Sequence, residues 1–122
     1  MSGAAMEAGR TLAMGQDEAG GGGRQSVEAP FGRALARLGQ SPPDIVGLTA
    51  DLGKYPDILP FRDAFPDRFF NVGMAEQNLV AVAAGLARTG KVPFATTYGV
   101  FATRRAYDFI AIALAHSNLN VK

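Results

Sequence analysis

The sequence contains no cysteine, no tryptophan and a single histidine. Without cysteine the chain forms neither disulfides nor thiolate metal sites, and one histidine argues against structural zinc. Twelve Lys and Arg side chains face eleven Asp and Glu side chains, which leaves a net charge of +1. This balance provides no strongly charged surface for nucleic acid, anionic lipid or a cationic partner. We therefore expect no metal site within the chain, and neither nucleic acid nor a membrane as a partner.

Long apolar runs are missing as well. No stretch approaches the ~20 consecutive apolar residues that span a bilayer, and no arginine-rich start precedes an apolar segment. We expect neither a signal peptide nor a membrane span, and the cytoplasm is the expected location. The length of 122 residues suits one domain.

The first 25 residues have the composition of a disordered tail. They contain the four-glycine run Gly20 to Gly23, flanked by Ala, Met and scattered charges without a period. Such a segment buries too little apolar surface to offset its ordering entropy. We therefore expect residues 1–25 to be a disordered tail and residues 26–122 to be the folded domain.

From Ser26, a candidate helix cap, helical and strand-like patterns alternate. This alternation predicts a three-layer α/β fold, with a parallel sheet and helices on both faces. The helix over 101–115 is apolar around most of its circumference, so we expect it to be buried. The predicted helices are 31–38, 56–65, 75–88 and 101–115, and the predicted strands are 45–48, 68–72, 92–97 and the opening of another at 119–122.

Three polar or aromatic segments follow the predicted strands directly. They contain Asp51, the run from Gly73 to Glu76, and the run from Tyr98 to Phe101. In open parallel sheets, ligands bind beyond the carboxyl ends of the strands. The pattern therefore predicts where a site lies but not what it binds.

Each candidate residue in these segments also has an ordinary structural interpretation. Glu76 lies in the first turn of a helix, where an acid opposes the helix dipole or completes a cap. Alternatively, Glu76 is a buried acid that faces a ligand, with burial raising its pKa and the helix start lowering it. Asp51 suits a turn or cap, Phe101 and Tyr107 suit a core, and His116 suits a helix end.

Two adjacent arginines, Arg104 and Arg105, lie within the apolar helix predicted at 101–115. An unpaired guanidinium is costly to bury, so we expect one of them to reach solvent. The other is expected to meet a carboxylate or a phosphate. The sequence does not distinguish which arginine does which.

Residues 71–78, Asn-Val-Gly-Met-Ala-Glu-Gln-Asn, resemble the G-[IM]-A-E-Q motif of transketolase-like enzymes. The likeness covers several ordered blocks between Ser26 and Lys122, which makes it more specific than the motif alone. It is strongest to the separately encoded C-terminal half of split transketolases. The other blocks are 49–53 (TADLG), 65–70 (FPDRFF), 84–94 (AGLARTGKVPF), 98–108 (YGVFATRRAYD) and 117–122 (SNLNVK).

The resemblance implies a thiamine-diphosphate-binding pyrimidine domain that is incomplete at its C-terminal end. Its implied activity is the transfer of a two-carbon ketol unit between sugar phosphates. In this family a glutamate at the position of Glu76 hydrogen-bonds N1′ of the cofactor's aminopyrimidine and thereby activates it. Phe101 and Tyr107 match aromatic positions that pack against the pyrimidine. Asp51 matches an acid near the cofactor and Gly73 belongs to the motif, whereas Arg104 falls where the family varies.

The family's diphosphate and Mg²⁺ site lies in a separate domain, and nothing here resembles it. The resemblance therefore implies a partner domain or subunit, in a homo- or hetero-oligomer, that holds Mg²⁺ and the diphosphate. Modules of 1-deoxyxylulose-5-phosphate synthase and of the 2-oxo acid dehydrogenase beta subunit are alternatives. A further alternative is a truncated, non-catalytic remnant, because the chain stops inside a predicted strand.

Overall fold

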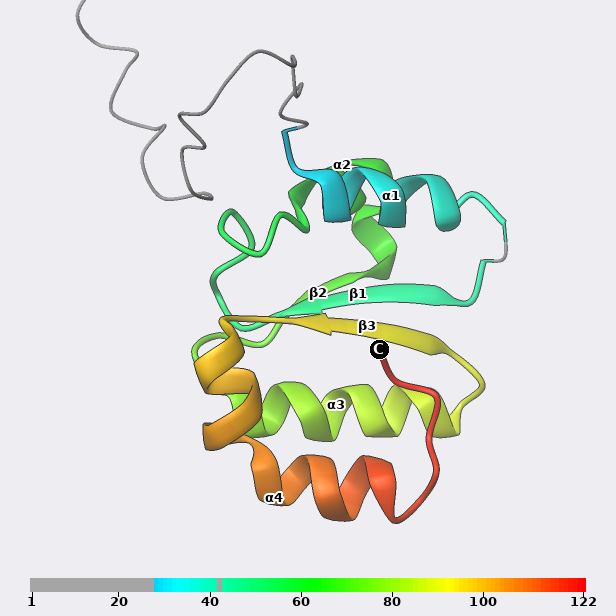
Figure 1. The fold of residues 1–122 in the computed structure, drawn as a ribbon. Helices are drawn as coiled ribbons and strands as arrows, with labels where there is room; N and C mark the ends of the chain where they lie inside the picture. The colour runs from blue at the N-terminus through cyan, green and yellow to red at the C-terminus, as the bar shows by residue number, and fades with distance from the viewer. Residues whose placement is uncertain (1–27, 42) are drawn as a thin grey trace, which may run out of the picture.

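The computed structural model describes residues 28–41 and 43–122. Within them, a parallel sheet has the strand order β2-β1-β3 (Figure 1). The residue at the middle of the central strand, Gly47, lies opposite Phe69 on one side and Phe94 on the other. The strands are β1 (Ile45–Thr49), β2 (Phe69–Asn71) and β3 (Val92–Thr96).

The central strand β1 is buried along its whole length. Its sequence, Ile-Val-Gly-Leu-Thr, is a nearly continuous apolar run rather than an alternation of apolar and polar residues. Such a run is typical of a parallel strand that is covered on both faces. The three-layer α/β arrangement predicted from the sequence is therefore confirmed.

Two helices, α1 (Pro30–Leu38) and α2 (Leu59–Ala64), cover one face of the sheet (Figure 1). The buried side chains of this face are Leu35, Ile45, Ile58 and Phe61. Phe61 is fully buried, and its ring lies against Gly47 of β1. This layer therefore depends on a strand position that has no side chain.

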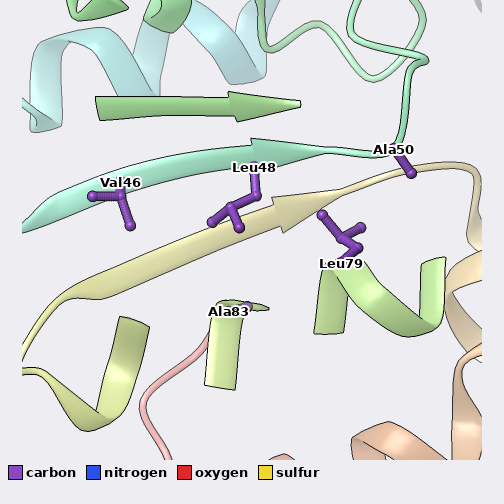
Figure 2. Packing of buried hydrophobic residues seen from close by; sticks show 5 residues of the cluster. All are labelled: Val46, Leu48, Ala50, Leu79 and Ala83. Atoms are coloured by element: carbon purple, nitrogen blue, oxygen red, sulfur yellow. The ribbon is translucent and has the colours of Figure 1, made fainter. Parts of the chain in front are cut away.

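The other face is covered by α3 (Glu76–Arg88), whose apolar side packs on β1 (Figure 1). Figure 2 shows Leu79 and Ala83 of α3 facing the strand side chains. Facing them are Val46 and Leu48 of β1 and Ala50 just after it, and all five side chains are buried. The strong amphipathic helix predicted at 75–88 is thus confirmed, with Ala75 as its cap rather than its first residue.

The segment from Phe101 to Ala115 packs against the outer side of α3 (Figure 1). It is helical, as predicted, but two parts of it, Phe101–Arg105 and Ile110–Ala115, have the wider π-type turn. The short helix α4 (Tyr107–Phe109) lies between them.

The expected burial of this helical segment is wrong. Within it only Ala106 is buried, while Tyr107 is 64% and Ile112 70% exposed. The physical reason is that one side packs on α3, whereas no element among the described residues covers the outer side. An apolar circumference was therefore an insufficient indicator of burial.

Several element boundaries also differ from the predictions. The helix expected at 56–65 begins only at Leu59, and the strand expected at 68–72 is limited to 69–71. Arg68 belongs to a short 3₁₀ helix, Pro66–Arg68, and its guanidinium donates hydrogen bonds to the carbonyl oxygens of Gly39 and Pro43. The tail expected at 1–25 and the cap expected at Ser26 lie outside the described residues.

The residues after the last helix run back alongside β3. The carbonyl oxygen of Lys122 accepts a hydrogen bond from the Ala95 amide at 2.8 Å, and its amide donates to the Pro93 carbonyl at 2.9 Å. This is the hydrogen-bond pattern of a parallel pair, but Lys122 alone makes it. The strand expected at 119–122 is not among the three strands of the sheet in the described residues. None of the described helices is both long and apolar enough to cross a membrane.

Two glycines test the packing of the sheet on α2. A Cβ at Gly47 would lie 2.7 Å from Cδ1 of the buried Phe61, whereas a Cβ at Gly85 in α3 meets nothing within 4 Å. We expect Gly47→Ala to lower the free energy of unfolding by about 1–3 kcal/mol because the core is overpacked. Gly85→Ala is the matched control and is expected to be neutral or stabilising, by up to about 1 kcal/mol. Chemical denaturation of both variants measures the difference, and equal effects would contradict the packing described here.

Candidate functional site

The carboxyl ends of the three strands bring the sequence-predicted segments to one edge of the sheet. Asp51 follows β1, Gly73 follows β2, and Tyr98 and Phe101 follow β3. The first residue of α3, Glu76, begins its helix at the same edge. The convergence predicted from the parallel topology is therefore present.

The side chain of Asn71 joins two of these strand ends. Its Oδ1 accepts hydrogen bonds from the backbone amides of Asp51 and Gly73, each at 3.0 Å, and its Nδ2 donates to Asp51 Oδ1 at 3.1 Å. Asp51 and Gly73 both have positive φ, 57° and 75°. Asp and Gly are among the residues that tolerate this conformation. Asn71 thus holds together the turn after β1 and the turn after β2, the second of which leads to α3.

Glu76 is a carboxylic acid in an almost fully enclosed position, with a relative exposure of 1%. One carboxylate oxygen, Oε2, accepts a hydrogen bond from Nη1 of Arg105 at 2.9 Å. The other oxygen, Oε1, is buried and has no hydrogen-bond partner within the described part of the chain. A buried acceptor without a partner is costly, which makes it a candidate for binding a donor on a ligand.

Arg105 is held in place by two further contacts. Its guanidinium carbon lies 4.2 Å from the ring centroid of Phe101, which is a cation–π arrangement. Its backbone carbonyl accepts a hydrogen bond from Nε2 of Gln77, the residue after Glu76. The ring of Phe101 is in turn 5.9 Å from that of Tyr98, and Tyr98 is 5.8 Å from Tyr55. A row of three aromatic rings thus ends at the Arg105–Glu76 pair.

Opposing effects act on the pKa of the Glu76 carboxyl. Burial raises the pKa because it disfavours the charged form, while the Arg105 hydrogen bond, a backbone hydrogen bond and the Arg105 charge lower it. The lowering effects prevail, so the pKa lies below its ordinary value of 4.5. The sequence alone left this balance open, and Arg105 decides it.

A cavity of about 170 Å³ lies between α3, β3 and the helical segment 101–115. Glu76 forms part of its wall together with mostly apolar side chains, among them Leu79, Ala95 and Ile110. The hydroxyl of Thr97, which also lines the cavity, is buried without a partner among the described residues. The cavity therefore combines a mostly apolar wall with two residues, Glu76 and Thr97, that each carry a buried oxygen without a partner among the described residues.

The candidate residues do not all gather at this place. Asp51, Gly73, Glu76 and Phe101 lie at or next to the edge just described, whereas Tyr107 is 64% exposed. Arg104 is exposed, and no acidic partner lies within ion-pair distance of it in residues 28–41 and 43–122. The same residues contain no group of three or more metal-ligating side chains.

Two residues of the site were not singled out as site residues from the sequence. Arg105 was recognised only as one of two arginines that needed a partner, and the structure selects it over Arg104. The available signal is spacing, because Arg105 follows Phe101 by four residues and therefore shares its helix face. Asn71 gave no comparable signal, since its role depends on the approach of β1 and β2.

The lowered pKa of Glu76 makes a prediction about acid stability. Because the folded pKa is below the unfolded one, the ionised pair stabilises the fold above about pH 5, and this contribution is lost as the pH falls through the folded pKa. We expect the free energy of unfolding to fall more steeply in acid for the wild type than for Glu76→Gln. Denaturant titrations at a series of pH values provide the measurement, and parallel curves would be inconsistent with the ion pair.

Comparisons with known proteins identify relatives of the chain. Residues 23–122 match the family model described as transketolase, pyrimidine binding domain. A transketolase family protein of Sinorhizobium fredii is 57% identical over 94 residues, which are 77% of this chain and 27% of that protein. A transketolase C-terminal section of Methanocaldococcus jannaschii is 45% identical over 75% of this chain and 29% of its own length. A 1-deoxy-D-xylulose-5-phosphate synthase of Halothermothrix orenii is 41% identical over 75% of this chain and 14% of its own.

A solved structure agrees with these relatives. It is a split gene transketolase described as an inactive beta4 tetramer, with a TM-score of 0.68 and 53% sequence identity. The match covers 77% of this chain and 31% of that one, so the chain spans less than a third of the relatives it matches. The chain belongs to the transketolase family, as a pyrimidine-binding domain.

Proposed function

We propose that the protein containing this chain is a component of a thiamine-diphosphate-dependent transketolase, and that Glu76 is its cofactor-activating acid. The carrying observation is that Glu76, a residue of the wall of an apolar cavity, has a buried Oε1 without a hydrogen-bond partner among the described residues. A flat heteroaromatic ring that brings its own donor would fill the cavity and satisfy this oxygen. The aminopyrimidine of thiamine diphosphate is such a ring when its N1′ carries a proton, because the unprotonated ring nitrogen only accepts hydrogen bonds.

The size and lining of the cavity support this assignment. An apolar cavity of about 150 Å³ is large enough to admit a benzene ring, and the cavity beside Glu76 measures about 170 Å³. Glu76 would hold the ring nitrogen N1′, while Phe101, at the edge of the same site, offers an aromatic face for stacking. Gly73 shapes the turn that leads to Glu76, and Asp51 lies beside it through its hydrogen bonds with Asn71. Tyr107 and Arg104 would contribute to cofactor binding from the outer part of the helical segment 101–115.

The chemistry divides between cofactor and protein. When bound, thiamine diphosphate supplies the reactive centre for two-carbon transfer between sugar phosphates. The role of Glu76 is to exchange a proton with N1′, which requires hydrogen-bond contact and an ionisable carboxyl. The enclosed position of Glu76 keeps water away from this contact.

The diphosphate and its Mg²⁺ would be held by a diphosphate-binding domain of a partner chain or of another part of the same protein. The described residues contain no candidate metal cluster, and the chain spans less than a third of its solved relative. That relative is described as inactive and tetrameric, which supports a requirement for a further component. The match to 1-deoxy-D-xylulose-5-phosphate synthase, at 41% identity, supports the second candidate function.

Substitution of Glu76 tests the proposal. In the complete protein, assembled with its diphosphate-binding component and supplied with thiamine diphosphate and Mg²⁺, we expect Glu76→Ala to lower two-carbon transfer by about 10²-fold or more. The control is Arg88→Gln at the far end of α3, where Arg88 donates a hydrogen bond to Ser117.

Coupled assays with an aldose phosphate acceptor and either a ketose phosphate or pyruvate as the two-carbon donor separate the two candidate activities. Transfer from the ketose phosphate identifies a transketolase, whereas decarboxylation of pyruvate with transfer of its remaining two carbons to the aldose identifies the synthase. Full activity of Glu76→Ala would exclude both enzymatic assignments for this site. An inactive wild-type assembly would favour a non-catalytic remnant.

A further inference from the structure

The two oxygens of the Glu76 carboxylate have different surroundings. Oε2 is bonded to Arg105, and Oε1 has no partner among the described residues. The terminal torsion of a glutamate is broad, so a carboxylate held by its stem alone would exchange its two oxygens freely. The bond to Arg105 therefore fixes the plane of the carboxylate and the direction in which the free oxygen points toward a ligand.

Arg105 can hold this bond because it is itself fixed before any ligand binds. Its guanidinium rests on the ring of Phe101 at 4.2 Å, and its backbone is tied to Gln77 on α3. Its side chain remains 47% exposed, so its charge keeps part of its hydration. The pair thus bears the desolvation cost of Glu76 but avoids part of the cost that a fully buried guanidinium would add.

Other charged groups near Glu76 do not share this role. Lys122 is the other charged residue in the cavity wall, and it approaches from the segment beside β3. Within the described part of the chain, Arg105 forms an ion pair with Glu76, and no other cation lies within 4.0 Å of the Glu76 carboxylate oxygens. Arg104, one residue earlier, lies on the exposed side of the helical segment.

We propose that Arg105 is a positioning residue for Glu76, which holds Oε2 so that Oε1 is the oxygen presented to the ring nitrogen of the bound cofactor. This proposal rests on the proposed function, because only a ring nitrogen gives the free oxygen a reaction partner. Arg105 itself does not contact the reacting atoms. It acts by orienting the carboxylate and by stabilising its ionised form.

The ion pair also influences where the shared proton lies. A carboxylate that keeps a cation on one oxygen has a weaker hold on a proton at the other oxygen, in line with the lowered pKa of Glu76. A proton shared between Glu76 and N1′ would therefore lie further toward the ring. Arg105 would thus favour the protonated ring while Glu76 remains charged.

The experiment follows the Glu76 carboxyl directly, in the complete protein without cofactor. Glutamate is labelled with ¹³C at the carboxyl carbon, the Glu76 signal is assigned with Glu76→Gln, and its pH titration is compared among three variants. We expect the midpoint to move to higher pH in Arg105→Gln and to stay at the wild-type value in Arg104→Gln. Arg105→Lys, which keeps the charge but loses the planar fork, should restore the midpoint in part.

A second readout uses the assembled enzyme. Arg105→Gln should lower kcat by up to about 10²-fold, and the acidic limb of its kcat/KM profile should move to higher pH. Arg105→Lys should recover part of kcat. A uniform loss of activity with no change in the pH profile would indicate a merely structural role and would overturn the proposal.

The titration separates this proposal from the proposed function, because it requires neither cofactor nor turnover. An unchanged Glu76 midpoint in Arg105→Gln overturns the positioning role even if Glu76→Ala abolishes catalysis. Retained activity of Glu76→Ala defeats the proposed function even if the midpoint moves. If Arg105→Gln does not fold, Arg105→Lys is used for the test. A Glu76 midpoint in Arg105→Lys identical to the wild-type value would then count against an oriented hydrogen bond.

Discussion

The burial of β1 on both faces is the constraint on which the rest of the structure depends. All five of its residues are buried, so each face needs a layer of helices to exclude water from the strand. The side chains Val46 and Leu48 point to one layer, and Ile45 contacts the other. Gly47 permits Phe61 to reach the sheet, which brings α2 and α1 close to it. The order of the layers thus follows from one five-residue strand.

The same strand also positions the candidate site. The chain leaves β1 and β2 through turns with positive φ, and the amide side chain of Asn71 ties these turns together. Because α3 starts three residues after Gly73, its first residue, Glu76, is placed at the edge where β3 and Phe101 also arrive. A rigid edge of this kind holds a carboxylate more accurately than a long loop would. The chemistry proposed for Glu76 requires such accuracy.

Much of this arrangement was predictable from the sequence, because the patterns that carry it are local. The apolar run at 45–48, the amphipathic period of 75–88 and the blocks shared with transketolases identified the fold class and the position of Glu76. The exposure of the outer side of the segment 101–115 was not predictable in this way, since it depends on which elements pack against the helix. The partner of Glu76 and the role of Asn71 were also hidden, because each depends on contacts between residues 20 or more positions apart.

The π-type turn from Phe101 to Arg105 has a consequence for how much length variation the site tolerates. Adjacent residues on a helix point in different directions, so a shift of one position normally removes a side chain from its partner. Here two arginines stand side by side, at positions 104 and 105. An insertion of one residue after Phe101 would place Arg104 four residues from the ring, in the position that Arg105 now occupies. The second arginine therefore gives the ion pair with Glu76 a spare donor, and a length change in this segment need not cost the acid its counter-ion.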